Sequence, residues 1–318
     1  MTSDGGTSTL SYTFLGPEGT FTEAALLQVP GAAEARRIPS ASAAVALAMV
    51  RSGEVDGAML PIENSIEGGV SATLDAIANG QELRILREAI VPVSFVLVAR
   101  EGVRREDIRR VGTHPHAWAQ TREWMEANMP GVEHFPANST AAAAFELLSE
   151  HPAYQAAICA PIVAERTKLA VLAAGIEDNS GAVTRFVLVG RPGLLPEPTG
   201  ADKTTVSIPL PEDRPGALMQ ILDQFASRGV NLSRIESRPT GQFLGHYFFS
   251  VDADGHISEA RVADALSGLH RISPNLRFLG SYPRADAQVP VVEPYTSDEA
   301  FRAAHMWVDR ILTGRDQG

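Results

Sequence analysis

The sequence is short of cysteine, of basic residues and of long apolar runs, and each shortage excludes a class of protein. Cys159 is the single cysteine among 318 residues, which excludes an intramolecular disulfide framework and a multi-cysteine metal site. We expect it to be a small buried apolar residue in a reducing compartment. With 27 Lys and Arg against 38 Asp and Glu, the net charge of −11 argues against binding to nucleic acid or to an anionic membrane surface.

No stretch reaches the length and apolar character of a membrane span, and residues 1–8 lack the apolar core of a secretion signal. We therefore expect a cytoplasmic protein with a flexible N-terminus over residues 1–9. What the sequence does have is a hydrophobic content of 44% with 20% charged residues, over a length typical of about two domains. These values predict a soluble globular enzyme or sensor.

The first domain is predicted over residues 10–190. Short apolar strands alternate there with helical stretches, which is the pattern of an α/β fold with a largely parallel sheet. The apolar stretch 89–99 indicates a crossing from one lobe to a second, and the chain returns through residues 156–159. We expect two α/β lobes around a cleft, with ligands bound outside the carboxyl ends of the strands.

Four strands of this domain are expected to run into loops that carry small polar side chains at a helix start. Such loops present unpaired backbone N–H groups and the positive end of the helix dipole, which favour anions. A single loop of this kind is a common helix cap, whereas four in one domain favour one shared negative ligand. The loops are 16–21, in which Thr20 and Glu23 have capping-box spacing, 61–69, 113–116 and 138–140, ahead of helices expected near 21, over 70–78, over 117–129 and after 140.

The triplet Thr184-Arg185-Phe186 follows the polar turn 178–181 and enters an apolar run that ends at Val189. It places a hydroxyl and a permanent cation at one end of a predicted buried strand. An arginine there is costly unless an anion meets it. Taken alone, the triplet fits a substrate anchor and a structural ion pair equally well.

Residues 191–202 are rich in proline and glycine and have no helical or strand period, so we expect a linker. After it, residues 203–283 are predicted to form a βαββαβ sandwich. The expected strands are 204–210, 231–237, 246–252 and 276–281, and the expected helices are 215–228 and 258–269. Residues 284–318 form a tail, in which Thr296 and Glu299 have capping-box spacing. An amphipathic helix follows, with an apolar face of Phe301, Ala304, Val308, Ile311 and Leu312 that we expect to pack on this chain or on a second subunit.

Six motifs in this order resemble prephenate dehydratase, the enzyme that converts prephenate to phenylpyruvate, over about residues 12–283. Those of the first domain are Gly16-Pro17-Glu18-Gly19-Thr20-Phe21, Pro61-Ile62-Glu63-Asn64-Ser65, Asn138-Ser139-Thr140-Ala141 and Thr184-Arg185-Phe186; those of the second are Gly216-Ala217-Leu218 and Glu236-Ser237-Arg238-Pro239, which look like the phenylalanine-binding motifs of an ACT domain. The segment Thr113-His114-Pro115-His116 departs from the family's more usual His-Pro-Gln.

The resemblance implies a two-lobed catalytic domain like a periplasmic binding protein and a ferredoxin-like ACT domain that pairs between subunits. It further implies a homo-oligomer, a dimer or a tetramer, in which L-phenylalanine acts as allosteric effector. The effector-binding residues that it implies are Pro215, Gly216, Ala217, Leu218, Asn231, Leu232, Glu236, Ser237, Arg238 and Pro239.

Prephenate is a dianion that loses carbon dioxide and its ring hydroxyl as the ring becomes aromatic. Because aromatisation drives the reaction, we expect no cofactor and no metal. The resemblance makes Thr184 essential, as a donor to the departing oxygen, and we expect Arg185 to bind a carboxylate of the substrate. Glu63 is either the acid or a loop carboxylate that accepts nearby N–H groups. The expected substrate-binding residues are Asn64, Ser65, Ser139, Thr140 and Phe186.

Other functions stay open at this point. Arogenate dehydratase acts on a substrate with an ammonium group where prephenate has a keto oxygen, and the sequence separates the two poorly. A non-catalytic cytoplasmic amino-acid sensor has the same domain order without turnover. A metal-dependent enzyme is disfavoured, because His114 and His116 come without an evident carboxylate or histidine partner; we expect structural or polar-loop roles for both.

Overall fold

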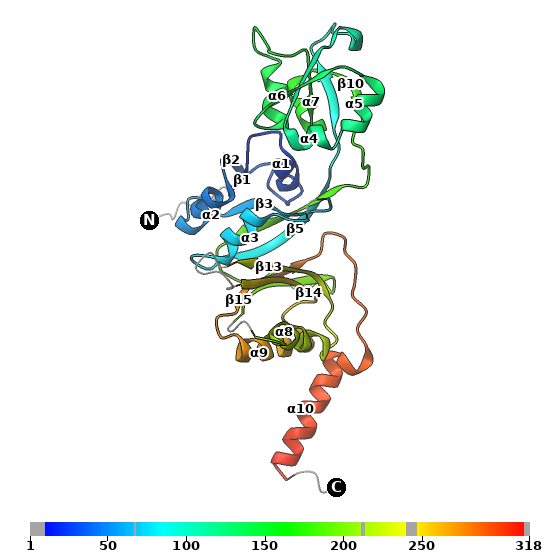
Figure 1. Cartoon of the computed structure of the whole chain (residues 1–318). Coiled ribbons are helices and arrows are strands. Elements are labelled where there is room, and N and C mark those ends of the chain that lie inside the picture. Colours follow the sequence, from blue (N-terminus) through cyan, green and yellow to red (C-terminus); the bar gives the residue numbers. More distant parts are fainter. Residues whose placement is uncertain (1–9, 67, 211–213, 240–246, 315–318) are drawn as a thin grey trace, which may run out of the picture. The chain divides into compact units, whose positions relative to one another are not determined.

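The computed structural model describes residues 10–66, 68–210, 214–239 and 247–314 (Figure 1). The chain divides into two compact units, one formed by residues 1–73 and 89–189 and the other by residues 74–88 and 190–318. The flexible N-terminus expected over residues 1–9 lies outside the described residues. No helix of the described ranges is long and apolar enough to cross a lipid bilayer.

The first unit contains two α/β lobes, each built on its own sheet, as the sequence pattern predicts. The first sheet holds β1 (Ser11–Leu15), β2 (Arg36–Ser40), β3 (Gly57–Asn64), β4 (Gly68–Gly69), β5 (Arg84–Pro92) and β11 (Val183–Gly190), in the order β2-β1-β3-β11-β5 with β4 beside β3. Its β1 pairs in parallel with β2 and β3. The second sheet holds β6 (Val96–Ala99), β7 (Arg110–Thr113), β8 (Glu133–Pro136), β9 (Ala156–Cys159) and β10 (Ala170–Ala174), in the order β10-β6-β9-β7-β8.

Two connections join the lobes. The first lies within residues 89–99, as expected, whereas the return expected through residues 156–159 is wrong, because those residues form β9 of the second sheet. The chain leaves the first sheet through β5 and enters the second at β6; it leaves the second sheet after β10 and returns at β11. Each lobe has its own apolar core. Phe14, Met59 and Phe186 are buried in the first lobe, whereas Leu97 and Ile158 are buried beneath the second sheet.

The helices of the first unit are α1 (Phe21–Leu26), α2 (Ala43–Ser52), α3 (Ser71–Ala78, of which residues 71–73 belong here), α4 (Pro115–Ala119), α5 (Arg122–Asn128), α6 (Thr140–Glu146) and α7 (Pro161–Thr167), with a short 3₁₀ turn at Arg105–Asp107. Four of them, α1, α3, α4 and α6, begin at or just after the expected polar loops. Thr20 caps α1 by accepting a hydrogen bond from the backbone N–H of Glu23 at 3.4 Å. The Glu23 carboxylate accepts the N–H of Gly19 at 2.7 Å.

The single helix predicted over 117–129 is wrong, because the structure has two helices there. The break falls at Gln120 and Thr121. Its physical reason lies far along the chain: the Asp178 carboxylate accepts the backbone N–H groups of Glu123 and Trp124, at 3.1 and 3.0 Å, and so caps a second helix.

The second unit contains the predicted βαββαβ sandwich. Its elements are β12 (Asp202–Pro209), α8 (Ala217–Ala226), β13 (Leu232–Pro239), β14 (Tyr247–Asp254), α9 (Ala260–Ile272) and β15 (Arg277–Pro283), with the antiparallel sheet order β13-β14-β12-β15. Both helices cover one face of this sheet (Figure 1). Val206, Ile221, Phe225 and Leu269 are fully buried between the sheet and the helices.

Residues 74–88 belong to the second unit through contacts with β12, β13 and β15. Arg277 donates to the carbonyl oxygens of Ala78 and Gly80, at 2.5 and 2.7 Å. Lys203 forms a buried ion pair with Glu88, at 3.2 Å. The segment that links residue 73 to residue 89 in the sequence therefore belongs to the second unit.

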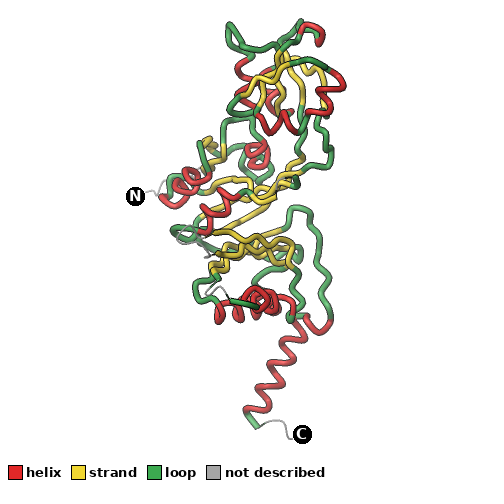
Figure 2. The backbone as a smooth tube through the Cα atoms, in the orientation of Figure 1, coloured by secondary structure: helices red, strands yellow, loops and turns green. Residues whose placement is uncertain are grey.

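The tail contains a 3₁₀ turn (Pro294–Thr296) and α10 (Asp298–Leu312) (Figure 2). The expected cap of this helix is wrong: Ser297, rather than Thr296, caps α10 by accepting the N–H of Ala300 at 3.2 Å. Thr296 is buried inside the preceding turn, where its hydroxyl donates to the carbonyl of Glu293. No residue of α10 is buried within this chain, and Val308, Ile311 and Leu312 of its apolar face are 44%, 48% and 77% exposed.

Candidate functional site

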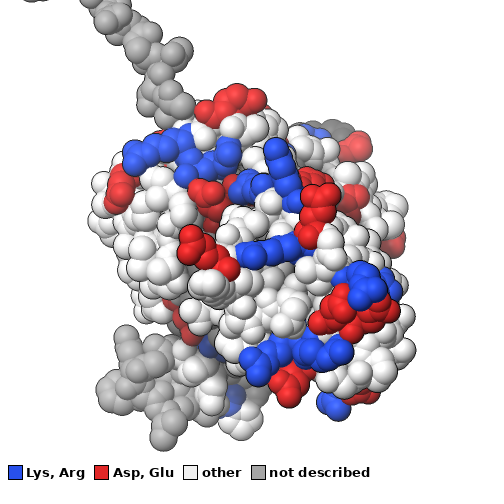
Figure 3. All heavy atoms as spheres, turned by 90° about the horizontal axis from the view of Figure 1, so that it is seen from above, with Lys and Arg blue, Asp and Glu red and all other residues white. Residues whose placement is uncertain are grey.

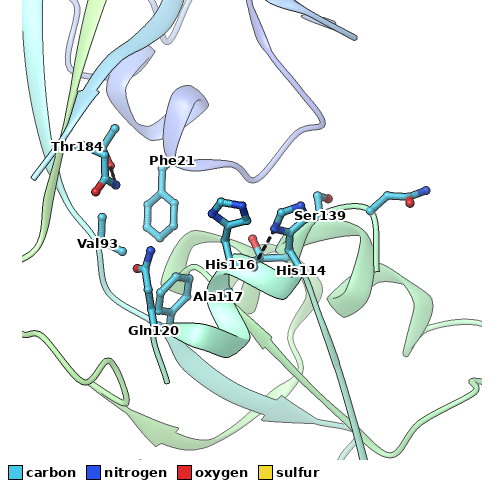
Figure 4. A pocket seen from close by; sticks show the side chains of 12 residues that line it. Phe21, Val93, His114, His116, Ala117, Gln120, Ser139 and Thr184 are labelled. Carbon is cyan, nitrogen blue, oxygen red and sulfur yellow. Dashed lines mark hydrogen bonds between the residues drawn. The ribbon is translucent and has the colours of Figure 1, made fainter. Parts of the chain in front are cut away.

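A cavity of about 320 Å³ is lined by residues from both lobes of the first unit (Figure 4). Its volume lies in the range of small-molecule sites, about 300 to 1,000 Å³. The lining residues are Phe21, Asn64 and Thr184 from the first lobe, Val93 and Phe95 from the connection, and His114, His116, Ala117, Gln120, Asn138, Ser139 and Thr140 from the second lobe.

Thr184 lies near the start of β11 and is 9% exposed. Its Oγ1 accepts a hydrogen bond from Nδ2 of Asn64 at 3.0 Å, and Oδ1 of Asn64 accepts the N–H of Ile66 at 2.8 Å. The second bond fixes the orientation of the Asn64 amide. Because the Thr184 oxygen accepts from Asn64, the hydroxyl proton can be donated to a ligand in the cavity.

Ser65 does not line the cavity but fixes the strand that carries Thr184. Its N–H donates to the carbonyl of Val183, and its Oγ accepts the N–H of Val183, both at 2.9 Å. Two bonds to the residue before Thr184 hold the start of β11 against the end of β3. Ser65 therefore positions the start of the strand that carries Thr184.

Arg185 points away from the face that Thr184 presents, because successive side chains alternate along a strand. Its guanidinium Nη1 lies 3.4 Å from Oε2 of Glu63, at the end of β3. The Arg185 side chain is 7% exposed and that of Glu63 is 37% exposed. Neither residue lines the cavity, and Phe186 is buried in the apolar core of the first lobe.

The opposite wall of the cavity comes from the loops before α4 and α6. Ser139 caps α6 by accepting the N–H of Ala142 at 2.9 Å, and Thr140 is the first residue of that helix. The ring centroids of His114 and His116 are 5.2 Å apart, and Nδ1 of His114 accepts the N–H of His116. In Figure 4, the ring of Phe21 lies between Thr184 and His116.

The electrostatic character of this lining suits an anion. The chain carries a net charge of −11, yet the lining residues include no Asp or Glu side chain. The side chains that offer hydrogen-bond donors are hydroxyls, amides and two imidazoles. The face shown in Figure 3 has Lys and Arg side chains interspersed with Asp and Glu.

The structure brings four of the eight residues expected at the first site to one cavity: Asn64, Ser139, Thr140 and Thr184. Glu63, Ser65, Arg185 and Phe186 lie outside the lining. Phe21, Gln120 and Asn138 also line the cavity although they were not expected to bind substrate, and His114 and His116 were not expected to contact a ligand. Their position was the available signal, because Phe21, His116 and Asn138 fall within the segments 16–21, 113–116 and 138–140 that were expected after strands. Among the described residues, no three His, Cys, Asp or Glu side chains are grouped in a way that could hold a metal ion.

A second cavity, of about 250 Å³, lies in the second unit at the start of α8. Gly216, with a φ of +84°, is the N-cap residue of this helix and has no side chain to cap it. The cavity is lined by Leu210, Arg214, Gly216, Ala217, Leu218, Met219, Ser237, Tyr247 and Phe249.

Four of the ten residues expected at the second site therefore line its cavity: Gly216, Ala217, Leu218 and Ser237. Strand alternation separates Ser237 from its neighbours Glu236 and Arg238 on β13. Arg238 pairs with Asp75, and the side chain of Asn231 donates to Asp254 at 2.8 Å. Pro215, Leu232 and Pro239 also lie outside the lining.

Comparisons with known proteins match a different family model to each of two segments of the chain. Residues 12–193 match the family model of prephenate dehydratase, and residues 204–271 match that of the ACT domain. A prephenate dehydratase of Mycobacteroides abscessus is 45% identical over 294 residues, which cover 91% of this chain and 94% of the relative.

Two solved structures extend the likeness to the fold. The crystal structure of prephenate dehydratase from Arthrobacter aurescens in complex with L-Phe is 68% identical, with a TM-score of 0.92, and the match covers 96% of this chain and 100% of that one. The prephenate dehydratase from Staphylococcus aureus is 27% identical, with a TM-score of 0.74, over 86% of this chain and 100% of that one. The expected fold, two periplasmic-binding-protein-like lobes with a ferredoxin-like ACT domain, is confirmed.

Proposed function

The chain belongs to the prephenate dehydratase family, and from this premise we propose that it converts prephenate to phenylpyruvate in L-phenylalanine biosynthesis, under allosteric control by L-phenylalanine. The observation that carries the proposal is the cavity in which the Thr184–Asn64 pair of one lobe lies opposite the Ser139–Thr140 loop of the other. Such a site binds a small anion between two walls of donors.

The reaction requires that the protein orient the substrate and stabilise the departing hydroxyl. The Thr184 hydroxyl accepts from Asn64, so its own proton is directed to an acceptor other than Asn64. A hydrogen bond that strengthens as charge develops on the leaving oxygen lowers the barrier by about 3 to 4 kcal/mol per donor. We assign this role to Thr184 and assign Asn64 to its orientation.

The two carboxylates of the substrate need donors on other walls. We assign one of them to the side chains of Asn138, Ser139 and Thr140, with the His114–His116 pair beside them. For the other carboxylate we assign Arg185, which lies outside the cavity lining and would have to exchange its 3.4 Å contact with Glu63 for a bidentate contact with the substrate. Glu63 loses this contact in the exchange; like Arg185 it lies outside the cavity lining, and it acts as the acid only if it is protonated and reaches the leaving oxygen.

The effector is proposed to bind in the 250 Å³ cavity of the second unit. Its carboxylate would meet the first backbone N–H groups of α8, beside Gly216, where the helix dipole favours a negative group. Its ring would contact Tyr247 and Phe249. The relative from Arthrobacter aurescens was crystallised with L-Phe, which supports this choice of ligand.

We further propose that a second copy of the chain completes this cavity. β13 is an edge strand, and Ile235 on it is 44% exposed. Met219, in the first turn of α8, is 68% exposed. Apolar side chains around an open cavity at a sheet edge favour pairing with a second sheet.

The reaction is assigned to the cytoplasm, in keeping with the unpaired thiol of Cys159.

One experiment separates this function from its alternatives. The purified protein is offered prephenate and arogenate separately, with and without L-phenylalanine, and phenylpyruvate and phenylalanine are followed. We expect phenylpyruvate from prephenate, with inhibition by L-phenylalanine. Preferred conversion of arogenate would make the protein an arogenate dehydratase, and no turnover of either substrate would make it a sensor. The variant Thr184→Ala controls for contaminating activity.

A further inference from the structure

A bidentate ion pair joins the two lobes of the first unit. Arg166 on α7 donates through Nη1 to Oε2 of Glu23 and through Nη2 to Oε1, both at 2.8 Å. Glu23 belongs to α1 of the first lobe and is 2% exposed, whereas the Arg166 side chain is 31% exposed. A bidentate guanidinium–carboxylate contact has a fixed geometry and is among the stronger polar contacts in proteins.

The same carboxylate holds the loop of residues 16–20. Oε2 of Glu23 accepts the N–H of Gly19 at 2.7 Å. Gly19 has a φ of +80°, and a Cβ atom at this position would lie 2.8 Å from Cγ2 of Val163 on α7. The loop therefore packs closely on the second lobe, and the ion pair fixes it there.

Phe21 follows this loop and lines the substrate cavity. Its ring makes an edge-to-face contact with Phe95, with centroids 5.7 Å apart, and packs against apolar clusters of both lobes. Because Phe21 directly follows residues 16–20, the contacts that fix this loop on α7 also determine the position of the Phe21 ring. The ion pair thus acts on the cavity without touching its contents.

The lobes are also joined by the two crossing segments. The N–H of Val93 donates to the carbonyl of Ala182, and the N–H of Ile176 donates to the carbonyl of Phe95. Two-lobed folds open by rotation about such crossing segments. Because Glu23 and Arg166 lie on helices outside these segments, their two hydrogen bonds have to break for the lobes to separate.

Other charged groups near the pair do not replace it. Arg37 Nε lies 3.8 Å from Oε1 of Glu23, but Arg37 is on β2 of the same lobe. Glu18 lies 4.0 Å from Arg166, at the limit of an ion pair, and its side chain is 64% exposed. Glu23 and Arg166 are therefore the charged pair that connects α1 to α7.

We propose that Glu23 and Arg166 are positioning residues of the dehydratase, which latch the two lobes in the arrangement that binds substrate. The proposal rests on the function proposed above. A latch changes the fraction of molecules that are ready to bind, and the apparent dissociation constant rises as that fraction falls. Saturating substrate closes the lobes again, so KM rises while kcat is retained. Partial unfolding has the opposite signature, because it lowers kcat at constant KM.

The test compares Glu23→Gln, Arg166→Gln, the double variant and Arg166→Lys with the wild type. Arg122→Gln removes the exposed Arg122–Glu126 pair of α5, at 2.8 Å, and is the matched control. We expect KM for prephenate to rise about tenfold in each Gln variant, with kcat within about twofold. The double variant should be no worse than either single variant. Arg166→Lys should restore part of the loss, since it keeps the charge without the fork.

Hydrogen exchange of the full chain provides a readout that needs no turnover. Faster exchange of residues 16–26 and 161–167 in the Gln variants, with no change in Arg122→Gln, supports the latch. Unchanged exchange, additive losses in the double variant, or a fall in kcat at constant KM would overturn it. If the wild type fails to convert prephenate, the proposed function falls, and the exchange experiment still decides whether the pair holds the lobes together.

Discussion

Arg238 donates two hydrogen bonds to the carboxylate of Asp75, at 3.1 Å from Nε and 2.8 Å from Nη2. Arg238 follows Ser237, which lines the effector cavity. Asp75 lies one turn into α3, the helix that begins at Ser71 directly after the β3–β4 hairpin that carries Asn64. The pair therefore joins a strand of the proposed effector site to the helix that follows a loop of the proposed substrate site.

We predict that Asp75→Asn weakens inhibition by L-phenylalanine more than it weakens binding of L-phenylalanine. Loss of about 1 kcal/mol of coupling raises the concentration for half-inhibition about fivefold. Because the side chains are 19% and 40% exposed, the effect on stability should be below about 1 kcal/mol. Inhibition curves and calorimetric titrations measure the two effects. An unchanged inhibition curve in Asp75→Asn would remove this pair from the coupling.

Replacement of Thr184 by alanine should lower kcat and leave KM within about threefold. The hydroxyl is proposed to act on the leaving oxygen in the transition state, and removal of one such donor costs about 100-fold to 1,000-fold in kcat. Thr184→Ser keeps the donor and should retain most of the turnover. Steady-state kinetics with prephenate check both variants. Turnover close to wild type in Thr184→Ala would contradict the assignment.

Arg185→Ala should chiefly raise KM, by about tenfold, because it removes a donor to a substrate carboxylate. Glu63→Gln tells this role from a structural one. If Arg185 leaves Glu63 to bind substrate, a neutral partner makes the exchange easier, and KM for Glu63→Gln stays at or below the wild-type value. If the pair only holds β3 to β11, both variants lose thermal stability and neither shows a selective change of KM.

The adjacent residues Thr184 and Arg185 show how far the sequence could predict the site. Strand ends and polar loops identified Thr184, Asn64, Ser139 and Thr140, and the structure places all four at one cavity. Which of two adjacent strand residues faces a cavity depends on the register of the strand, so Arg185 could not be placed from sequence alone.

Contacts between distant segments account for the rest. The break between α4 and α5 depends on Asp178, more than 50 residues away, and no local pattern indicates it. Phe21 stood in a motif that the sequence analysis had identified. Its place in the cavity, however, depends on how the first lobe packs on the second.

Cys159 should resist thiol reagents in the native protein. It is fully buried on β9, and desolvation raises the pKa of its thiol to about 12. The reactive thiolate is therefore scarce at neutral pH as well as inaccessible. We expect no reaction with Ellman's reagent in buffer and one thiol per chain in denaturant. Rapid labelling of the native chain would show that the second lobe opens around β9.

The pH dependence of stability should reveal the Glu23–Arg166 pair. Burial alone raises the pKa of the Glu23 carboxyl, but the hydrogen bonds from Arg166 and Gly19, with the charges of Arg166 and Arg37, lower it below its ordinary value of 4.5. A carboxyl group with a depressed pKa in the folded state stabilises the protein above its unfolded pKa, and this contribution is lost as pH falls through the folded pKa. The thermal advantage of the wild type over Glu23→Gln should therefore be complete near pH 7 and should shrink below about pH 4.5. Melting curves of both proteins from pH 7 to well below pH 4.5 measure it, with Arg122→Gln as control. An advantage that grew on acidification would mean that Glu23 is protonated in the folded protein, and the bidentate pair could not then be the contact that holds the two lobes.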